Sequence, residues 1–287
     1  MIQLSTQLTS AYLYIIIYTE VIILKIIEQF IKGKNENSLL CEDGLFINDD
    51  FIAVFDGATS ERNGDFNGRT GGRAAMEKAV EIMHKAPADI DAVTLFVKIN
   101  NGILSLYHGE STGEAAVCAI IFSRYRNEIW AVGDCQCRIN SQYYPHDKEV
   151  DTVLAKVRAI VLELARLEGK TDEELMSNDI GRQFIVPILK KQHLLANSDS
   201  RFGYAVLNGT PFDKNKIEIH PVNDGDTVIL ASDGYPFLHS SLEQSEKALA
   251  DTIKENPLCC DEKYEATKGI YNSNSSFDDR TFIKFIV

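Results

Sequence analysis

The chain has 287 residues, 45% of them hydrophobic, and a formal net charge of −13 at pH 7. That length and apolar content are enough for a large buried core, and one domain is the default because single α/β or all-sheet domains of about 200 to 250 residues are common. The acidic balance, with no block of lysine or arginine, excludes a nucleic-acid backbone as partner, since that partner requires a basic face to displace counterions.

The N-terminal segment is strongly apolar but interrupted by charges. Residues 11–27 read AYLYIIIYTEVIILKII, with a glutamate and a lysine inside the run. A transmembrane helix needs about 20 largely uncharged residues, and a signal peptide starts with positive charge, so neither is expected. The β-branched and aromatic residues predict an edge or first strand over 21–30. Residues 1–20 are then an extension, and residues 21–287 form a single domain.

The first half of the chain alternates between strands and helices. Asn48, Asp49 and Asp50 supply turn chemistry between two apolar runs, which predicts a hairpin ending at Asp56. A second hairpin ends at Asp134, and apolar residues at helical spacing lie between the two hairpins. The predicted strands lie at 44–48, 51–56, 115–122 and 128–133, and the predicted helices at 74–84 and 90–107.

The second half contains longer helices and then returns to strands. Apolar residues recur at helical spacing from 150 to 169, and Gly169 is suited to end that helix. The predicted helices lie at 150–169, 172–176, 182–195 and 242–256, and the predicted strands at 203–207, 216–220, 226–231 and 281–287. Strands, helices, strands, helices and a final strand are typical of a sheet sandwich covered by helices on both outer faces.

Three aspartates stand at strand ends that are far apart in the chain: Asp56, Asp233 and Asp278. Two carboxylates about 4 Å apart repel by roughly 4 kcal/mol at an effective dielectric constant near 20, so clustering them is unfavourable unless a cation neutralises them. Oxygen ligands suit Mg²⁺ and Mn²⁺, and such an ion makes the cluster favourable. The pattern therefore predicts a metal-dependent enzyme.

Five short motifs around these positions follow one another in a set order. They are Glu42-Asp43, Val54-Phe55-Asp56-Gly57, Ala131-Val132-Gly133-Asp134, Ala231-Ser232-Asp233-Gly234 and Asp278-Asp279-Arg280-Thr281. With them, from about residue 40 to the end, the chain resembles the metal-dependent protein phosphatase 2C family. The resemblance implies an α+β fold, a four-layer α-β-β-α sandwich of two antiparallel sheets flanked by helices. It also implies two Mn²⁺ or Mg²⁺ ions in each active site and a phosphorylated protein as substrate.

By position, the resemblance makes Asp56 the ligand that bridges both metal ions. The other implied ligands are the backbone carbonyl of Gly57 and the side chains of Glu42, Asp43, Asp233 and Asp278. Asp56, Asp233 and Asp278 would carry catalysis. A metal-activated water, rather than a side chain, would attack phosphoserine or phosphothreonine. The expected protein is a cytoplasmic serine/threonine phosphatase.

The sequence departs from the family where relatives bind the substrate phosphate. Relatives carry an arginine shortly before the Glu-Asp pair, but residues 37–41 read Asn-Ser-Leu-Leu-Cys. The candidates to bind the phosphate instead are Lys34, Arg62, Arg69 and Arg73. Arginine is the better bidentate phosphate ligand. The missing arginine favours an alternative function, a phosphatase-fold regulatory or binding module with little or no turnover, and an acidic domain without metal is a third hypothesis.

The remaining chemistry-bearing residues are assigned structural roles. Asp134 could serve a third metal ion or end a turn after Gly133, and the turn is preferred because position 237 is phenylalanine where some relatives have a carboxylate. The six histidines show no HExxH spacing, so none is expected to bind metal. The six cysteines lack the C-x-x-C spacing of a zinc site and are expected to be reduced thiols.

Overall fold

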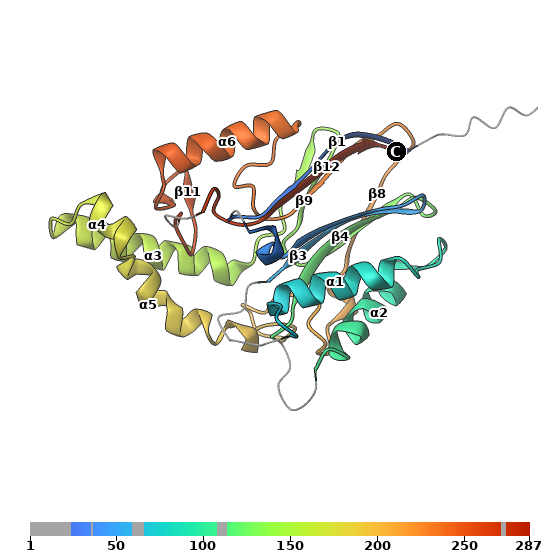
Figure 1. Ribbon diagram of the computed structural model, residues 1–287, viewed down its shortest axis with the longest axis horizontal. Coiled ribbons are helices and arrows are strands. Elements are labelled where there is room, and N and C mark those ends of the chain that lie inside the picture. Colours follow the sequence, from blue (N-terminus) through green and yellow to red (C-terminus); the bar gives the residue numbers. More distant parts are fainter. Residues whose placement is uncertain (1–23, 36, 59–65, 108–113, 271–273) are drawn as a thin grey trace, which may run out of the picture.

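The centre of the fold is a pair of five-stranded antiparallel sheets that lie face to face (Figure 1). In this computed structural model the described residues are 24–35, 37–58, 66–107, 114–270 and 274–287. One sheet, sheet A, has the strand order β1-β12-β9-β6-β7, and the other, sheet B, has the order β2-β3-β4-β5-β8. The expected N-terminal extension and Arg62 lie outside the described residues.

The strands and helices have the following bounds. Sheet A consists of β1 (Lys25–Lys32), β6 (Gln136–Ile139), β7 (Gln142–Tyr144), β9 (Thr227–Ala231) and β12 (Arg280–Ile286). Sheet B consists of β2 (Asp43–Ile47), β3 (Phe51–Gly57), β4 (Val117–Ser123), β5 (Glu128–Val132) and β8 (Glu218–Pro221). The helices are α1 (Gly71–Met83), α2 (Ala92–Leu104), α3 (Glu149–Leu167), α4 (Asp172–Ser177), α5 (Ile180–Leu189) and α6 (Leu242–Glu255), and a small hairpin consists of β10 (Cys260–Asp261) and β11 (Tyr264–Glu265). In the part of the chain that the structure describes, no helix is long and apolar enough to cross a membrane.

Alternation of side chains along the strands builds a core on each face of each sheet. Val54 and Ile120 of sheet B pack between the sheets with residues of sheet A such as Phe285. On the opposite face of sheet B, Phe55 and its neighbours pack under α1 and α2. The outer face of sheet A, which includes Phe282, is covered by α6 (Figure 1). The layers are thus helix, sheet, sheet and helices, which confirms the predicted α+β sandwich.

Most predicted elements are observed within a few residues of their predicted ends, but the predicted strand at 203–207 is wrong. Only isolated bridges occur there, such as the one between Leu207 and Val117. The side chain of Asn197 donates a hydrogen bond of 2.9 Å to the carbonyl oxygen of Val206. Side-chain bonds of this kind satisfy part of the backbone locally, so the segment pairs with neighbouring chain only at single residues.

Helices α3, α4 and α5 lie beyond one end of the sandwich (Figure 1). α3 packs mainly against α5 and against the β10–β11 hairpin. Arg158 of α3 is fully buried at this junction and donates hydrogen bonds to Asp179 Oδ2 (2.7 Å) and to the carbonyl oxygen of Leu258 (2.7 Å). The helix predicted at 182–195 corresponds to α5. It starts earlier than predicted because Asp179 is its N-cap, and it is shorter than predicted because it ends at Leu189.

Candidate active site

Three carboxylates from different strands converge in one place. Asp56 stands near the end of β3, Asp134 follows β5 and Asp233 follows β9, and one oxygen of each lies within 4.8 Å of the others. β3 and β5 belong to sheet B and β9 to sheet A, so the cluster bridges the two sheets. Asp56 and Asp233 therefore lie side by side, and Asp134, expected to end a turn, joins them.

The glycines that follow two of these aspartates have a packing role. A Cβ atom on Gly57 would lie 2.6 Å from the carbonyl oxygen of Glu42, and one on Gly234 would lie 2.0 Å from the carbonyl oxygen of Asp279. Neither glycine has the positive φ that would make glycine necessary for a turn. The two Asp-Gly pairs thus mark close approaches of backbone segments, which bring Glu42 and Asp279 against the cluster.

Asp278 is held beside the cluster by two lysines. Lys34 Nζ donates to its Oδ1 at 2.8 Å, and Lys268 Nζ donates to its Oδ2. Burial raises the pKa of Asp278, but the charges and hydrogen bonds of the lysines outweigh burial and hold the pKa well below its usual range. Asp278 is therefore ionised, and its charge acts on both Asp56 and Asp233.

Glu42 and Asp43 are both buried but have different partners. The carboxylate of Glu42 lies 3.9 Å from Lys34 Nζ and so borders the same group of charges. Asp43 Oδ2 accepts hydrogen bonds from the hydroxyls of Ser232 (2.6 Å) and Thr281 (2.8 Å). Burial raises the pKa of Asp43 although these two bonds oppose the shift. Asp43 thus joins β2 to sheet A next to the cluster.

The three converging aspartates differ in their electrostatics. Reduced contact with bulk water inside the cavity, followed by the charges of neighbouring aspartates, raises the pKa of both Asp56, which is half-buried, and Asp233, whose side chain is exposed to the cavity. Burial also acts on Asp134, but Lys148 Nζ lies 2.6 Å from its Oδ2 and outweighs burial, so the pKa of Asp134 is lowered. Lys148 is the N-cap residue of α3. The uncompensated negative charge therefore lies at Asp56 and Asp233, where a cation would relieve it.

The aspartates line a cavity of about 580 Å³. Basic side chains line the same cavity and come from separate parts of the chain: Lys34, Lys148, Arg182, Lys190 and Lys268. Several of these residues belong to α3, α5 or their ends, so the helices beyond the sandwich form part of the cavity wall. The cavity thus combines the aspartate cluster with several basic side chains, and Glu114, Asp147, Asp151 and Glu265 also line it.

The arginines expected to bind phosphate lie elsewhere in the described part of the chain. Arg69 pairs with Glu77 at 3.1 Å, and Arg73 donates to Glu77 Oε1 at 2.9 Å and to the carbonyl oxygen of Cys41 at 2.8 Å. Neither arginine lines the cavity. Arg73 instead anchors the segment that precedes Glu42, which is a structural role.

The donor set suits hard divalent cations. The interacting acidic groups include Glu42, Asp43, Asp56, Asp134, Asp233, Asp278 and Asp279, and the ammonium groups beside them include those of Lys34, Lys148 and Lys268. In this group the carboxylates outnumber the ammonium groups, so a bound cation would offset negative charge. Every donor is an oxygen atom, the ligand type that Mg²⁺ and Mn²⁺ prefer.

The protein is thus an α+β sandwich with a cavity between the ends of its sheets, and the carboxylates in this cavity could hold a metal ion. No family model matches the chain, and the search of curated proteins found no match. Among solved structures, the catalytic domain of the serine/threonine protein phosphatase PstP in complex with two manganese ions is similar to this chain. The two sequences are 12% identical, the alignment covers 92% of this chain and 98% of that chain, and the TM-score is 0.49. The phosphatase Stp1 from Staphylococcus aureus is similar at 15% identity, with 91% and 94% covered and a TM-score of 0.45. RsbX in complex with magnesium is similar at 12% identity, with 92% and 99% covered and a TM-score of 0.44.

Proposed function

We propose that this protein is a metal-dependent phosphoprotein phosphatase that hydrolyses phosphoserine or phosphothreonine. The observation that carries the proposal is the convergence of Asp56, Asp134 and Asp233 in a cavity that lysines also line. Carboxylates this close together repel one another unless cations lie between them, and a phosphate ester is bound by positively charged groups. A cavity with both features is suited to hold metal ions and a phosphate group together.

Oxygen atoms from both sheets would hold two Mn²⁺ or Mg²⁺ ions. The proposed ligands are the carboxylates of Glu42, Asp56, Asp134, Asp233 and Asp278 and the backbone carbonyl of Gly57. Asp43 would act through water, because its Oδ2 already accepts two hydrogen bonds. When bound, the ions would lower the pKa of a water molecule and neutralise charge on the phosphoryl oxygens.

Lysines would take the place of the phosphate-binding arginine. Lys34 and Lys268 both pair with Asp278 in this structure. A cation bound by Asp278 would compete for its charge and leave these ammonium groups available to a phosphate monoester. Lysine binds phosphate as a point charge, without the bidentate geometry of arginine. The helices that form part of the cavity wall would select which phosphorylated segment can enter.

The cysteines support a cytoplasmic location for this activity. All six are free and buried in the structure. Reduced thiols in such number suit the reducing cytoplasm, where disulfides are rare. We therefore include the cytoplasm in the proposal.

The test is hydrolysis of a small aryl phosphate and of a phosphothreonine peptide, with Mn²⁺, with Mg²⁺ and with chelator. We expect turnover by the wild type that requires metal and is lost in Asp233→Asn by a factor of about 100 or more, because a metal ligand and its charge are removed. Asp199→Asn is the matched control, since Asp199 is exposed and does not line the cavity.

Two results would contradict the enzymatic proposal. Equal turnover by the wild type and Asp233→Asn would show that the carboxylate cluster does not carry catalysis. Absence of turnover together with measurable Mn²⁺ binding would favour the regulatory or binding module, and the lack of the phosphate-binding arginine would then be its physical basis.

A further inference from the structure

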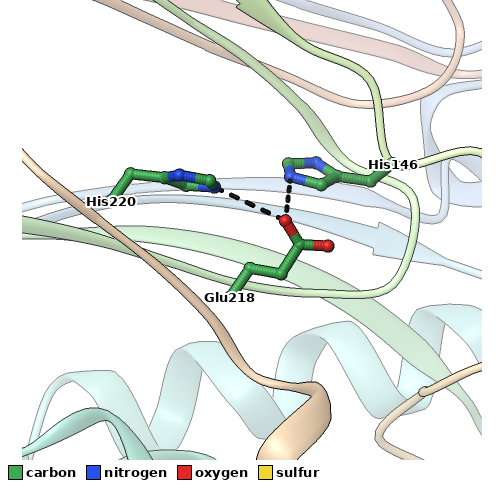
Figure 2. A group of neighbouring side chains, drawn as sticks. All are labelled: His146, Glu218 and His220. Atoms are coloured by element: carbon green, nitrogen blue, oxygen red, sulfur yellow. Dashed lines mark ion pairs between the residues drawn. The ribbon is translucent and has the colours of Figure 1, made fainter.

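A second group of metal-ligand side chains lies away from the carboxylate cavity. His146, Glu218 and His220 direct one ligand atom each toward a common point, and these atoms lie within 4.8 Å of one another (Figure 2). Glu218 Oε2 lies 3.3 Å from His146 Nε2 and 3.6 Å from His220 Nε2. None of the three residues lines the cavity. The expectation that no histidine binds metal rested on spacing along the chain, whereas the fold assembles this group.

The group forms where the edges of the two sheets meet. Glu218 and His220 are two residues apart on β8, so their side chains point to the same face of the strand. β8 is an edge strand of sheet B. His146 follows β7, which is an edge strand of sheet A. A ligand held by all three residues would therefore connect the two sheets along this edge.

His146 has the orientation of a metal-binding histidine. Its side chain is only 2% exposed, and its Nδ1 lies against the backbone carbonyl oxygen of Cys135. A carbonyl oxygen can only accept, so Nδ1 carries a proton, and Nε2 is the ring nitrogen that faces Glu218. A bond from the second ring nitrogen to a carbonyl is what fixes the tautomer and the orientation of metal-bound histidines.

Two buried nitrogen atoms in this group lack hydrogen bonds. In the described chain, Nε2 of His146 and Nε2 of His220 are both buried without a hydrogen-bond partner. The lone pair of a neutral imidazole repels a carboxylate oxygen unless a positive charge lies between them. Leaving a buried polar atom unsatisfied costs about 1 to 3 kcal/mol. A cation between Glu218 and the two imidazoles would satisfy all three ligand atoms at once.

We propose that His146, Glu218 and His220 form a binding site for a zinc-type divalent cation, with three protein ligands and an open fourth position. Ligands about 2.1 Å from a tetrahedral zinc ion lie about 3.4 Å apart. The two separations that involve Glu218, 3.3 and 3.6 Å, match this geometry, and all three ligand atoms lie within 4.8 Å of one another. Two imidazoles with one carboxylate favour zinc over the hard cations that the carboxylate cavity suits. The side chain of Glu218 is 53% exposed, so water can reach the fourth position.

The test is a calorimetric titration of the full chain with Zn²⁺ in an excess of Mg²⁺, a hard cation that suits the carboxylate cavity and not two imidazoles. The wild type is expected to bind one further equivalent of Zn²⁺. Glu218→Gln and His220→Gln are each expected to weaken this binding about tenfold or more, since each removes a ligand. His239→Gln is the matched control, because His239 is exposed and lies outside the group.

A second readout separates the site from a general loss of structure. Glu218 is exposed enough for glutamine to fit without repacking, so Glu218→Gln should unfold at the wild-type temperature in the presence of chelator. Zn²⁺ is expected to raise the melting temperature of the wild type and to leave that of Glu218→Gln almost unchanged. Equal Zn²⁺ affinity in these two proteins, or no Zn²⁺ binding by the wild type in Mg²⁺, would overturn the proposal, and the histidines would then share a proton with Glu218.

Discussion

At the residue scale, Asp56 and Asp233 oppose folding when no cation is bound. Both lie beside other carboxylates, and burial and those neighbours raise the pKa of each. A carboxyl group whose pKa is raised in the folded state binds protons more tightly there than in the unfolded chain. Its contribution therefore reduces stability above the unfolded pKa, which is about 3.9 for aspartate.

We expect Asp56→Asn to stabilise the metal-free protein by about 1 to 2 kcal/mol at neutral pH, less than the roughly 4 kcal/mol of two bare charges 4 Å apart. The gain should shrink as the pH falls toward about 4, because the wild-type carboxyl group then becomes protonated. Thermal unfolding in chelator at both pH values measures this, with Asp199→Asn as the control. A variant less stable than the wild type in chelator would show that Asp56 has a favourable metal-free partner.

The sequence predicts the aspartates of the site but not the lysine that pairs with one of them. Asp56 and Asp233 follow apolar strands, so their position near a sheet end could be expected from local pattern. Asp134 carries the same signal, and a turn was a sufficient explanation for it. No sequence motif marks Lys148 as part of the site. It is the N-cap residue of α3, and only the tertiary fold brings it to Asp134. The group of His146, Glu218 and His220 could not be predicted from the sequence either, because its members come from the edges of different sheets and meet only in the folded protein.

At the element scale, an ion pair between Arg280 and Glu246 helps to hold α6 on sheet A. Arg280 of β12 is buried and donates to both carboxylate oxygens of Glu246 on α6, at 2.7 and 2.9 Å. The hydroxyl of Tyr235 donates to the same carboxylate at 2.8 Å. Partial burial raises the pKa of Glu246, but the bonds from Arg280 and Tyr235 outweigh it and lower the pKa. The ionised form of Glu246 thus stabilises the folded protein.

We expect Glu246→Gln to lower the free energy of unfolding by about 1.5 to 3 kcal/mol at neutral pH, the usual contribution of hydrogen bonds to a charged group. Because the folded pKa of Glu246 lies below its unfolded value of about 4.3, the contribution is complete above that value and is lost as the pH falls through the folded pKa. Urea unfolding at pH near 7 and near 3 measures the difference, which should narrow in acid. An equal loss in Glu262→Gln, an exposed glutamate in a turn, would contradict this account.

Elements were predictable where the pattern is local and long. The helices α1 and α2 show clear periodicity because each presents one apolar face to a core, whereas β3 is a continuous apolar run because both of its faces are buried. The segment at 203–207 also has apolar residues, but Asn197 satisfies its backbone, which no periodicity reveals. Short strands such as β10 and β11 carry too few residues to show a period.

At the scale of the whole molecule, the carboxylate cluster joins the two sheets. Asp56 belongs to sheet B, whereas Asp233 and Asp278 flank strands of sheet A. A cation held by residues of both sheets binds the folded state and not the unfolded chain. Metal binding is therefore coupled to the stability of the sandwich.

We expect Mg²⁺ at about 100 times its dissociation constant to add about 2.7 kcal/mol to stability, which corresponds to a rise in melting temperature of roughly 5 to 10 °C for a chain of this size. Asp233→Asn should lose most of this rise. Differential scanning calorimetry across a Mg²⁺ series measures it. A rise of the same size in both proteins would place the cation outside the carboxylate cluster.

Under the proposed function, the sandwich would supply the chemistry, and α3 and α5 would contact the substrate. The aspartates belong to the sandwich or its loops, whereas these helices lie beyond its end and border the same cavity. Because α3 packs mainly on α5 and on the β10–β11 hairpin, changes on the cavity side of the helices leave both sheets intact. Lys148 is the point where the two parts depend on each other, through its pair with Asp134. A descendant of this chain could therefore acquire a new substrate by altering the helices alone, provided that this lysine is kept.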